Sequence, residues 1–368
     1  MLSYRKLAMR VLGRPLNTGG GNNSPRPASQ RAAALVLTAA LLTGAAFPAF
    51  ADTYYIENGD IVISAGTEAG TNKVEQGGTL KSENDKGTII SSSNKDTASS
   101  HTVTIDAEDK NDKVEVTLKD VNIDASSRNE AAVSVTGKGD TNIELDGDNE
   151  LKSGAGHAGL EHNKTDTSGE LTIQDKDNNG SLEAAGGFKG AGIGSAGSHD
   201  AQVKITGGNI TATTSDDWGA GIGSGSYGTG TVEITGGEIN ATGGYLGAGI
   251  GGGCNGSGNV TISGGTITAA GSDGAAGIGG GYYNGATVTI TGDAVIKNAS
   301  STKYGAGIGG GNGSDGNVTI SGNAKIENAT GGYGAAGIGG GAFSSPDKIG
   351  NGNVVIKENA EIDNVQGG

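Results

Sequence analysis

The chain has 368 residues, of which 73 are glycine, and its formal net charge is −15. This much glycine, with no 3.6-residue apolar period, excludes a helical protein, because glycine is a poor helix former. The acidic surplus repels phosphate backbones, so we expect no nucleic-acid partner.

The first 51 residues have the features of a secretory signal peptide. They contain six basic residues and no acidic residue, and an apolar run extends from Ala32 to Phe47. Small residues at Ala49 and Ala51 precede Asp52, as at a signal cleavage site. We therefore expect a secreted protein, held in solution or at the cell surface, with no membrane segment after cleavage. Because the basic region is long, an uncleaved N-terminal anchor is the alternative.

Residues 52–115 contain short stretches in which apolar and polar residues alternate. Examples are Ile61-Val62-Ile63 and Val103-Thr104-Ile105. A period of two is typical of β-strands. We expect an N-terminal cap and irregular first coils here, followed by regular repeats over residues 116–368.

A repeat of about 28 residues dominates the rest of the chain. The tetrapeptide AGIG occurs six times, with isoleucine at Ile193, Ile222, Ile250, Ile278, Ile308 and Ile338. A valine-x-isoleucine pair such as Val260/Ile262 keeps the same interval, and a further aliphatic such as Ile267 follows it. In degenerate form this pattern extends back to Val116, which predicts about nine coils.

Each repeat predicts three short strands separated by glycine-rich corners. In the unit starting at Asn259, Val260 and Ile262 point to one side and Thr261 to the other. Ile267 and Ile278 supply the inward residues of the second and third strands. The predicted fold is all-β, a right-handed three-sided parallel β-helix of about nine coils, each of about 28 residues. Propeller blades are excluded, since each needs about 40 residues.

The aromatic residues after position 51 flank the AGIG tetrapeptide, apart from Tyr54 and Tyr55. Five of them precede its isoleucine by four or five residues: Phe188, Trp218, Tyr245, Tyr304 and Tyr333. Four follow it at the same distance: Tyr227, Tyr282, Tyr283 and Phe343. Because equivalent positions stack in a solenoid, we expect two aromatic columns that border a flat strip of glycine and alanine.

A flat strip edged by rings suits a polysaccharide, since sugar C–H faces pack on aromatic faces. Eight residues are the expected carbohydrate contacts: Phe188, Trp218, Tyr227, Tyr245, Tyr282, Tyr283, Tyr304 and Tyr333. The alternative is that these rings only stack on one another and cover the corners of the coils.

One segment resembles the opening of a calcium-binding loop. Asp175-Lys176-Asp177-Asn178-Asn179-Gly180 has the D-x-D-x-N-G spacing. The expected metal ligands are Asp175, Asp177, Asn179 and Glu183, although Gly186 stands where a calcium loop carries glutamate. A turn between two strands explains the same residues.

Signals for catalysis are weak. Asp216 and Asp217 are adjacent acids, and paired carboxylates can hydrolyse a glycosidic bond, but neighbouring strand residues point to opposite faces. The four histidines, His101, His157, His162 and His199, share no coil position and have no metal-ligand spacing. The single cysteine, Cys254, stands at a corner position. We expect a non-catalytic protein.

The coils resemble a known group of proteins. VTISGGTITAAGSDGAAGIGGG and VEITGGEINATGGYLGAGIGGG are similar to coils of secreted bacterial β-helix proteins of the pectate-lyase-like superfamily. The stretch VEVTLKDVNIDASSRNEAAVSVTGKGDTNIELDGDNELKSG resembles the carbohydrate-binding-domain family of that group. The resemblance, over about residues 100–368, implies a polysaccharide binder assisted by calcium and without a catalytic centre.

Two other functions remain open. One is a surface adhesin or structural stalk with no glycan site, and the other is a polysaccharide lyase or glycoside hydrolase. Lyases of this superfamily use arginine or lysine near calcium, and Arg128 is the only arginine after residue 51. The chain stops at Gly368 in the rhythm of a coil, which leaves a strand edge open to pairing. We therefore expect end-to-end self-association or a missing C-terminal region.

Overall fold

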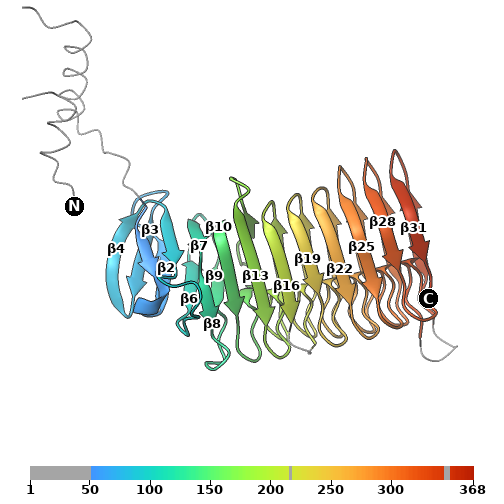
Figure 1. The fold of residues 1–368 in the computed structure, drawn as a ribbon, viewed down its shortest axis with the longest axis horizontal. Coiled ribbons are helices and arrows are strands. Elements are labelled where there is room, and N and C mark those ends of the chain that lie inside the picture. Colours follow the sequence, from blue (N-terminus) through green and yellow to red (C-terminus); the bar gives the residue numbers. More distant parts are fainter. Residues whose placement is uncertain (1–50, 215–217, 344–348) are drawn as a thin grey trace, which may run out of the picture. The chain divides into compact units, whose positions relative to one another are not determined.

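The computed structural model describes residues 51–214, 218–343 and 349–368. Their strands form three parallel ladders, which we call faces A, B and C, and each coil passes from A to C to B. Figure 1 shows the strands of successive coils side by side in sequence order. The predicted three-sided β-solenoid is confirmed, with nine coils from β7 onward.

Face A contains the valine-x-isoleucine pairs of the repeat. Its strands are β1 (Thr53–Tyr55), β5 (Thr88–Ser91), β7 (Lys113–Lys119), the first half of β10 (Asp140–Lys152), β12 (Leu171–Gln174), β15 (Asp200–Ile205), β18 (Gly230–Ile234), β21 (Gly258–Ile262), β24 (Ala286–Ile290), β27 (Gly316–Ile320) and β30 (Gly352–Ile356).

Face C contains the aliphatic that follows each pair. Its strands are β8 (Asn122–Asp124), the second half of β10, β13 (Gly180–Gly186), β16 (Asn209–Thr214), β19 (Glu238–Thr242), β22 (Thr266–Gly271), β25 (Val295–Ser301), β28 (Lys325–Thr330) and β31 (Glu361–Gln366).

Face B contains the AGIG tetrapeptides, and most of its strands have only two residues. They are β2 (Ile61–Ala65), β6 (Val103–Ala107), β9 (Val133–Gly137), β11 (Leu160–Lys164), β14 (Ile193–Gly194), β17 (Ile222–Gly223), β20 (Ile250–Gly251), β23 (Ile278–Gly279), β26 (Ile308–Gly309) and β29 (Ile338–Gly339).

The N-terminal end of face B carries an antiparallel hairpin. Strand β3 (Asn72–Gln76) pairs with β2, and β4 (Thr79–Asp85) pairs with β3. Gly77 and Gly78 form the two-residue turn between them, with φ of 58° and 70°. A 3-10 turn at Ile56–Asn58 (η1) is the one helical element in the described residues, and no helix there has the length and apolarity to cross a membrane.

The interior is built from ladders of one residue type at one coil position. Ile234, Ile262 and Ile290 are in register on face A, and none of them is exposed. Ile250 and Ile278 stack in the same way on face B. Full burial of each such side chain contributes about 1.5–3 kcal/mol, so the stack of coils is stable without a disulfide.

Candidate functional site

The AGIG segment forms a closed arch rather than an open strand. In the coil of Ile250, the N–H of Ala248 donates to the carbonyl of Gly252 at 3.0 Å. The same bond closes six coils, at Ala191–Ser195, Ala220–Ser224, Ala248–Gly252, Ala276–Gly280, Ala306–Gly310 and Ala336–Gly340. The chain therefore enters and leaves face B along adjacent paths.

Closure of the arches buries the segment that we expected to be a surface. Ala248 and Ile250 have no exposed area, and the neighbouring glycines are buried. A Cβ on Gly251 would lie 2.1 Å from the carbonyl oxygen of Gly279, so this glycine lets one backbone pack directly on the next. The expectation of an exposed flat strip of glycine and alanine is wrong.

The loops on the two sides of the arch meet above it. The N–H of Cys254, after one arch, donates to the carbonyl of Trp218, before the preceding arch, at 2.7 Å. The N–H of Ala342 donates to the carbonyl of Tyr304 in the same way at 2.8 Å. The two expected aromatic columns thus join into one surface, which we call the aromatic ridge: Phe188, Trp218, Tyr227, Tyr245, Tyr282, Tyr283, Tyr304, Tyr333 and Phe343.

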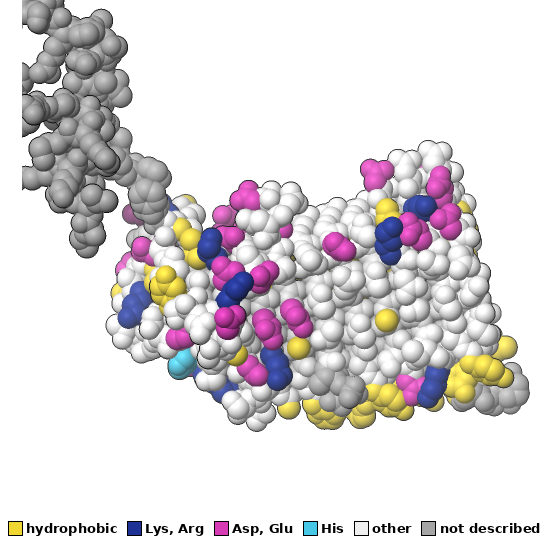
Figure 2. Space-filling model, in the orientation of Figure 1, with side chains coloured by type: hydrophobic (Ala, Val, Ile, Leu, Met, Phe, Trp, Pro, Cys, Tyr) yellow, Lys and Arg dark blue, Asp and Glu magenta, His cyan; other side chains and the backbone are white. Residues whose placement is uncertain are grey.

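The aromatic ridge follows one edge of the solenoid. Figure 2 shows hydrophobic side chains gathered along the lower edge of the molecule in that view. Tyr333 is 77% exposed and Tyr227 is 57% exposed, while Phe188, Tyr245 and Tyr283 are also exposed. Rings of this size with so much free area can make contacts beyond those within the chain.

One end of the ridge combines rings with a cation. The centroids of Phe188 and Trp218 are 5.8 Å apart. The Nζ atom of Lys189 lies 5.1 Å from the Phe188 centroid and 5.3 Å from that of Trp218. This cation–π contact holds the two rings together and places an ammonium group beside them.

The other end of the ridge is rich in tyrosine. The hydroxyl of Tyr282 donates to that of Tyr283 at 2.9 Å, and Tyr283 contacts Phe343 with centroids 5.8 Å apart. Tyr304 and Tyr333 meet edge to face at 6.2 Å. These contacts support the alternative that the rings stack on one another, yet they leave hydroxyls at the surface.

Asp273, which interrupts the aromatic row in the coil of Ile278, is bonded to its neighbours. Its carboxylate accepts a hydrogen bond from the Tyr245 hydroxyl and pairs with Lys303 Nζ at 2.6 Å. The hydrogen bond and the negative charge raise the pKa of Tyr245. Asp273 therefore contacts both Tyr245 and Lys303 within the ridge.

The calcium-like segment forms a turn after β12. Asp175 accepts backbone N–H bonds from Asn179 at 3.2 Å and from Gly180 at 3.0 Å. Asp177 is exposed, and Glu183 lies on face C between Glu150 and Thr211 in register. In residues 51–214, 218–343 and 349–368, no group of three or more His, Cys, Asp or Glu is placed to hold a metal.

The first arch is closed by a carboxylate, a feature that our sequence reasoning missed. Glu161 is in register with Gly194, and its Oε2 accepts the N–H of Ala158 at 3.0 Å. The same oxygen lies 2.9 Å from His157 Nδ1, and Glu161 is 5% exposed. The carboxylate replaces the carbonyl that closes the other arches. The change from AGIG to AGLE was the available signal.

Two further candidates for chemistry, His162 and Cys254, lie in different coils. Asp216 and Asp217 fall outside the described residues. His162 is buried against the carbonyls of Val135 and Gly169, and burial lowers its pKa. Burial raises the pKa of the Cys254 thiol to about 11, which disfavours a thiolate at neutral pH.

Comparison with known proteins identifies the repeat. The family model described as Beta helix repeat matches residues 203–226, 232–254, 260–282 and 318–342. Each match begins at the face A valine and ends just after an arch. No curated protein and no solved structure matches the chain significantly. The matches therefore support a parallel β-helix protein and do not indicate a ligand or a reaction.

Proposed function

We propose that this β-solenoid is a non-catalytic polysaccharide-binding protein and that the aromatic ridge is its binding surface. The observation that carries the proposal is the continuity of the ridge, whose exposed rings come from successive coils along one edge. A linear polymer that lies along this edge contacts ring after ring. Phenol hydroxyls along the ridge, and the Lys189 ammonium group beside Phe188 and Trp218, supply hydrogen bonds to the polymer.

We also propose that the protein acts outside the cell. The signal-peptide features of residues 1–51 support this location, although these residues, apart from Ala51, fall outside the described part of the chain. A secreted or surface-held binder meets extracellular polysaccharide directly. Calcium assistance through Asp175, Asp177, Asn179 and Glu183 is part of the proposal and requires its own measurement.

The test replaces Trp218 and Tyr245, which come from adjacent coils of the ridge, with alanine. We expect Trp218→Ala/Tyr245→Ala to weaken retention on insoluble polysaccharide at least tenfold, because two stacking surfaces are lost. Pull-down on insoluble cellulose and pectin, with and without EDTA, measures retention and its calcium dependence. Tyr55→Ala removes an exposed ring of β1, which lies outside the ridge, and serves as the control.

Unchanged retention in the ridge variant would refute the ridge as the binding surface. If the unaltered protein is retained by no polysaccharide, and binds host cells or matrix instead, the chain acts as an adhesin or stalk. New reducing ends or unsaturated products in the same incubation would indicate a hydrolase or lyase.

A further inference from the structure

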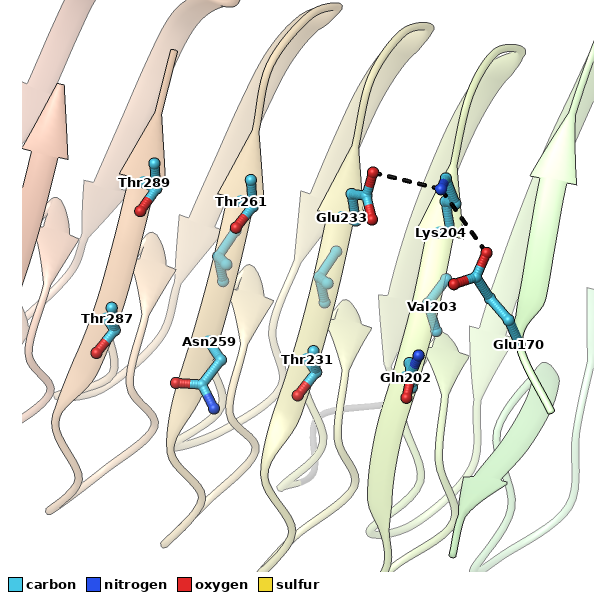
Figure 3. Close-up of a pocket in the computed structure, with 12 residues that line it drawn as sticks. Glu170, Gln202, Val203, Lys204, Thr231, Glu233, Asn259, Thr261, Thr287 and Thr289 are labelled. Atoms are coloured by element: carbon cyan, nitrogen blue, oxygen red, sulfur yellow. Dashed lines mark ion pairs between the residues drawn. The ribbon is translucent and has the colours of Figure 1, made fainter. Parts of the chain in front are cut away.

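A shallow hollow lies on the outer surface of face A, away from the aromatic ridge. Its volume is about 350 Å³, and its outward side chains come from β15, β18, β21 and β24, with Glu170 at one end. Figure 3 shows these side chains on one side of the strands, in rows that cross from coil to coil. The lining contains no aromatic residue.

The register of the strands arranges the polar side chains in two parallel rows. Thr231, Asn259 and Thr287 are aligned in one row, and Thr261 is aligned with Thr289 in the other. Neighbours within a row are separated by the strand spacing of about 4.8 Å. The hollow therefore presents amides and hydroxyls at regular intervals along the solenoid axis.

The uncharged side chains of these rows retain their hydrogen-bonding capacity. Among the described residues, none of the six makes a side-chain hydrogen bond: Gln202, Thr231, Asn259, Thr261, Thr287 and Thr289. On face C the Asn328 amide donates to the carbonyl of Lys297 at 3.0 Å and accepts from Asn364 at 3.1 Å, whereas the described Thr211, Asn240 and Thr268 are as unpaired as the face A rows. Face A differs from that row in the hollow that its polar groups line. The face A rows are thus free to bind a ligand.

The charges of the hollow are confined to one end, where one lysine lies between two glutamates. Lys204 Nζ lies 3.7 Å from Glu170 and 3.4 Å from Glu233, as the dashed lines in Figure 3 show. From Asn259 to Thr289 the lining is uncharged. Such a surface does not attract a polyanion or a polycation, and it complements a neutral chain that carries many hydroxyl groups.

We infer that face A is a second glycan-binding site, which takes a neutral polysaccharide laid along the solenoid axis. The inference rests on the proposed function and deepens it, because the ridge and the hollow lie on different faces of the solenoid. One molecule can then hold two polysaccharide chains. Binding at both faces makes the protein a cross-linker as well as a binder.

The test removes the polar groups of one row while it preserves side-chain size. The variant is Thr231→Val/Asn259→Leu/Thr287→Val. Face C offers a matched control, because Thr211, Asn240 and Thr268 form the same Thr-Asn-Thr row in register. The control is Thr211→Val/Asn240→Leu/Thr268→Val. Asn259→Lys, at an exposed position, is a second variant that leaves the backbone unchanged.

Affinity electrophoresis in hydroxyethyl cellulose, a neutral soluble glycan, measures the Kd. We expect both face A variants to raise the Kd at least tenfold relative to the face C control. The ridge variant Trp218→Ala/Tyr245→Ala should still bind the glycan, but more weakly than the unaltered protein. Combining it with Thr231→Val/Asn259→Leu/Thr287→Val should abolish this remaining binding. The unaltered protein should increase the low-shear viscosity of the glycan solution, and either single-face variant should not.

Two outcomes separate the inference from the proposed function. If the face A variants bind like the face C control while the ridge variant loses binding, the second site is refuted and the ridge stands. If the unaltered protein binds neither hydroxyethyl cellulose nor polygalacturonate, the proposed function fails as well.

Discussion

Cys254 shows how one corner position adapts to the close contact of two loops. It lies just after an arch, where Ser226, Tyr282, Asn312 and Ala342 stand in other coils. Its side chain is 3% exposed, because the loop before the preceding arch covers it. The position accepts small, polar or aromatic side chains, so no chemistry of the thiol is needed to explain the residue.

The thiol of Cys254 should make the stability of the protein depend on alkaline pH. Its pKa is about 11 in the folded chain and about 8.5 in an unfolded chain, so the unfolded state loses the proton first. We expect the free energy of unfolding to fall as the pH rises from about 8.5 to about 11. Urea titrations at several pH values give the free energy of unfolding of the unaltered protein and of Cys254→Ser. The difference between the two proteins isolates the thiol, because the titration of the tyrosines affects both equally. An equal loss in both proteins would contradict the prediction.

The arch is the element that distinguishes face B from faces A and C. Its isoleucine points inward, and its second glycine adopts a φ of 129° to 141° in all six coils. Its alanine closes the turn through one hydrogen bond. Glu161 performs the same closure with a side chain, which shows that the requirement is an acceptor for the alanine N–H.

Gly251→Ala should be much more destabilising than alanine at an open glycine. Both Gly251 and Gly78 have positive φ, but only a Cβ on Gly251 meets a neighbouring carbonyl, whereas the site around Gly78 is empty. We expect Gly251→Ala to cost ~1–3 kcal/mol beyond Gly78→Ala, because the close contact adds to the backbone strain. Chemical denaturation of the two variants measures this difference. An equal loss of stability in the two variants would mean that the positive φ alone, and not the close contact, makes glycine necessary at position 251.

At the scale of the whole molecule, each coil contacts mainly the coils directly before and after it. Faces A, B and C all pair strands of successive coils. In such a solenoid, stability is the sum of local interfaces, and a weakened coil affects its neighbours first. The last coil differs, since β30 and β31 are exposed over most of their length.

Ile250→Ala in a central coil should cost about 2–5 kcal/mol, because the side chain has no exposed area and its loss leaves a cavity. Ile362→Ala in β31 should cost less, because that residue is only partly buried. Hydrogen exchange should show the loss of protection in β17, β20 and β23 first. Equal loss of protection in all coils would show that the solenoid unfolds as a single unit.

The periodicity of the sequence was sufficient to predict the fold. Inward valine and isoleucine at a fixed interval require a repeating coil, and alternation within NVTI assigns Val260 to the interior and Thr261 to the surface. The aromatic positions were predictable for the same reason, since equivalent positions stack. Register follows from sequence when one residue type recurs at one coil position.

The surface of face B depended on contacts that no local pattern contains. Two backbone hydrogen bonds decide whether glycine and alanine form an exposed strip or lie beneath two loops. One joins Ala248 to Gly252, and the other joins Cys254 to Trp218 in the preceding coil. The hollow on face A also required the register of four strands, because Thr231, Asn259 and Thr287 are 28 residues apart in sequence. The sequence by itself determined which side chains of faces A and C point outward. The tertiary structure decided which of them meet, because that depends on how neighbouring coils close against each other.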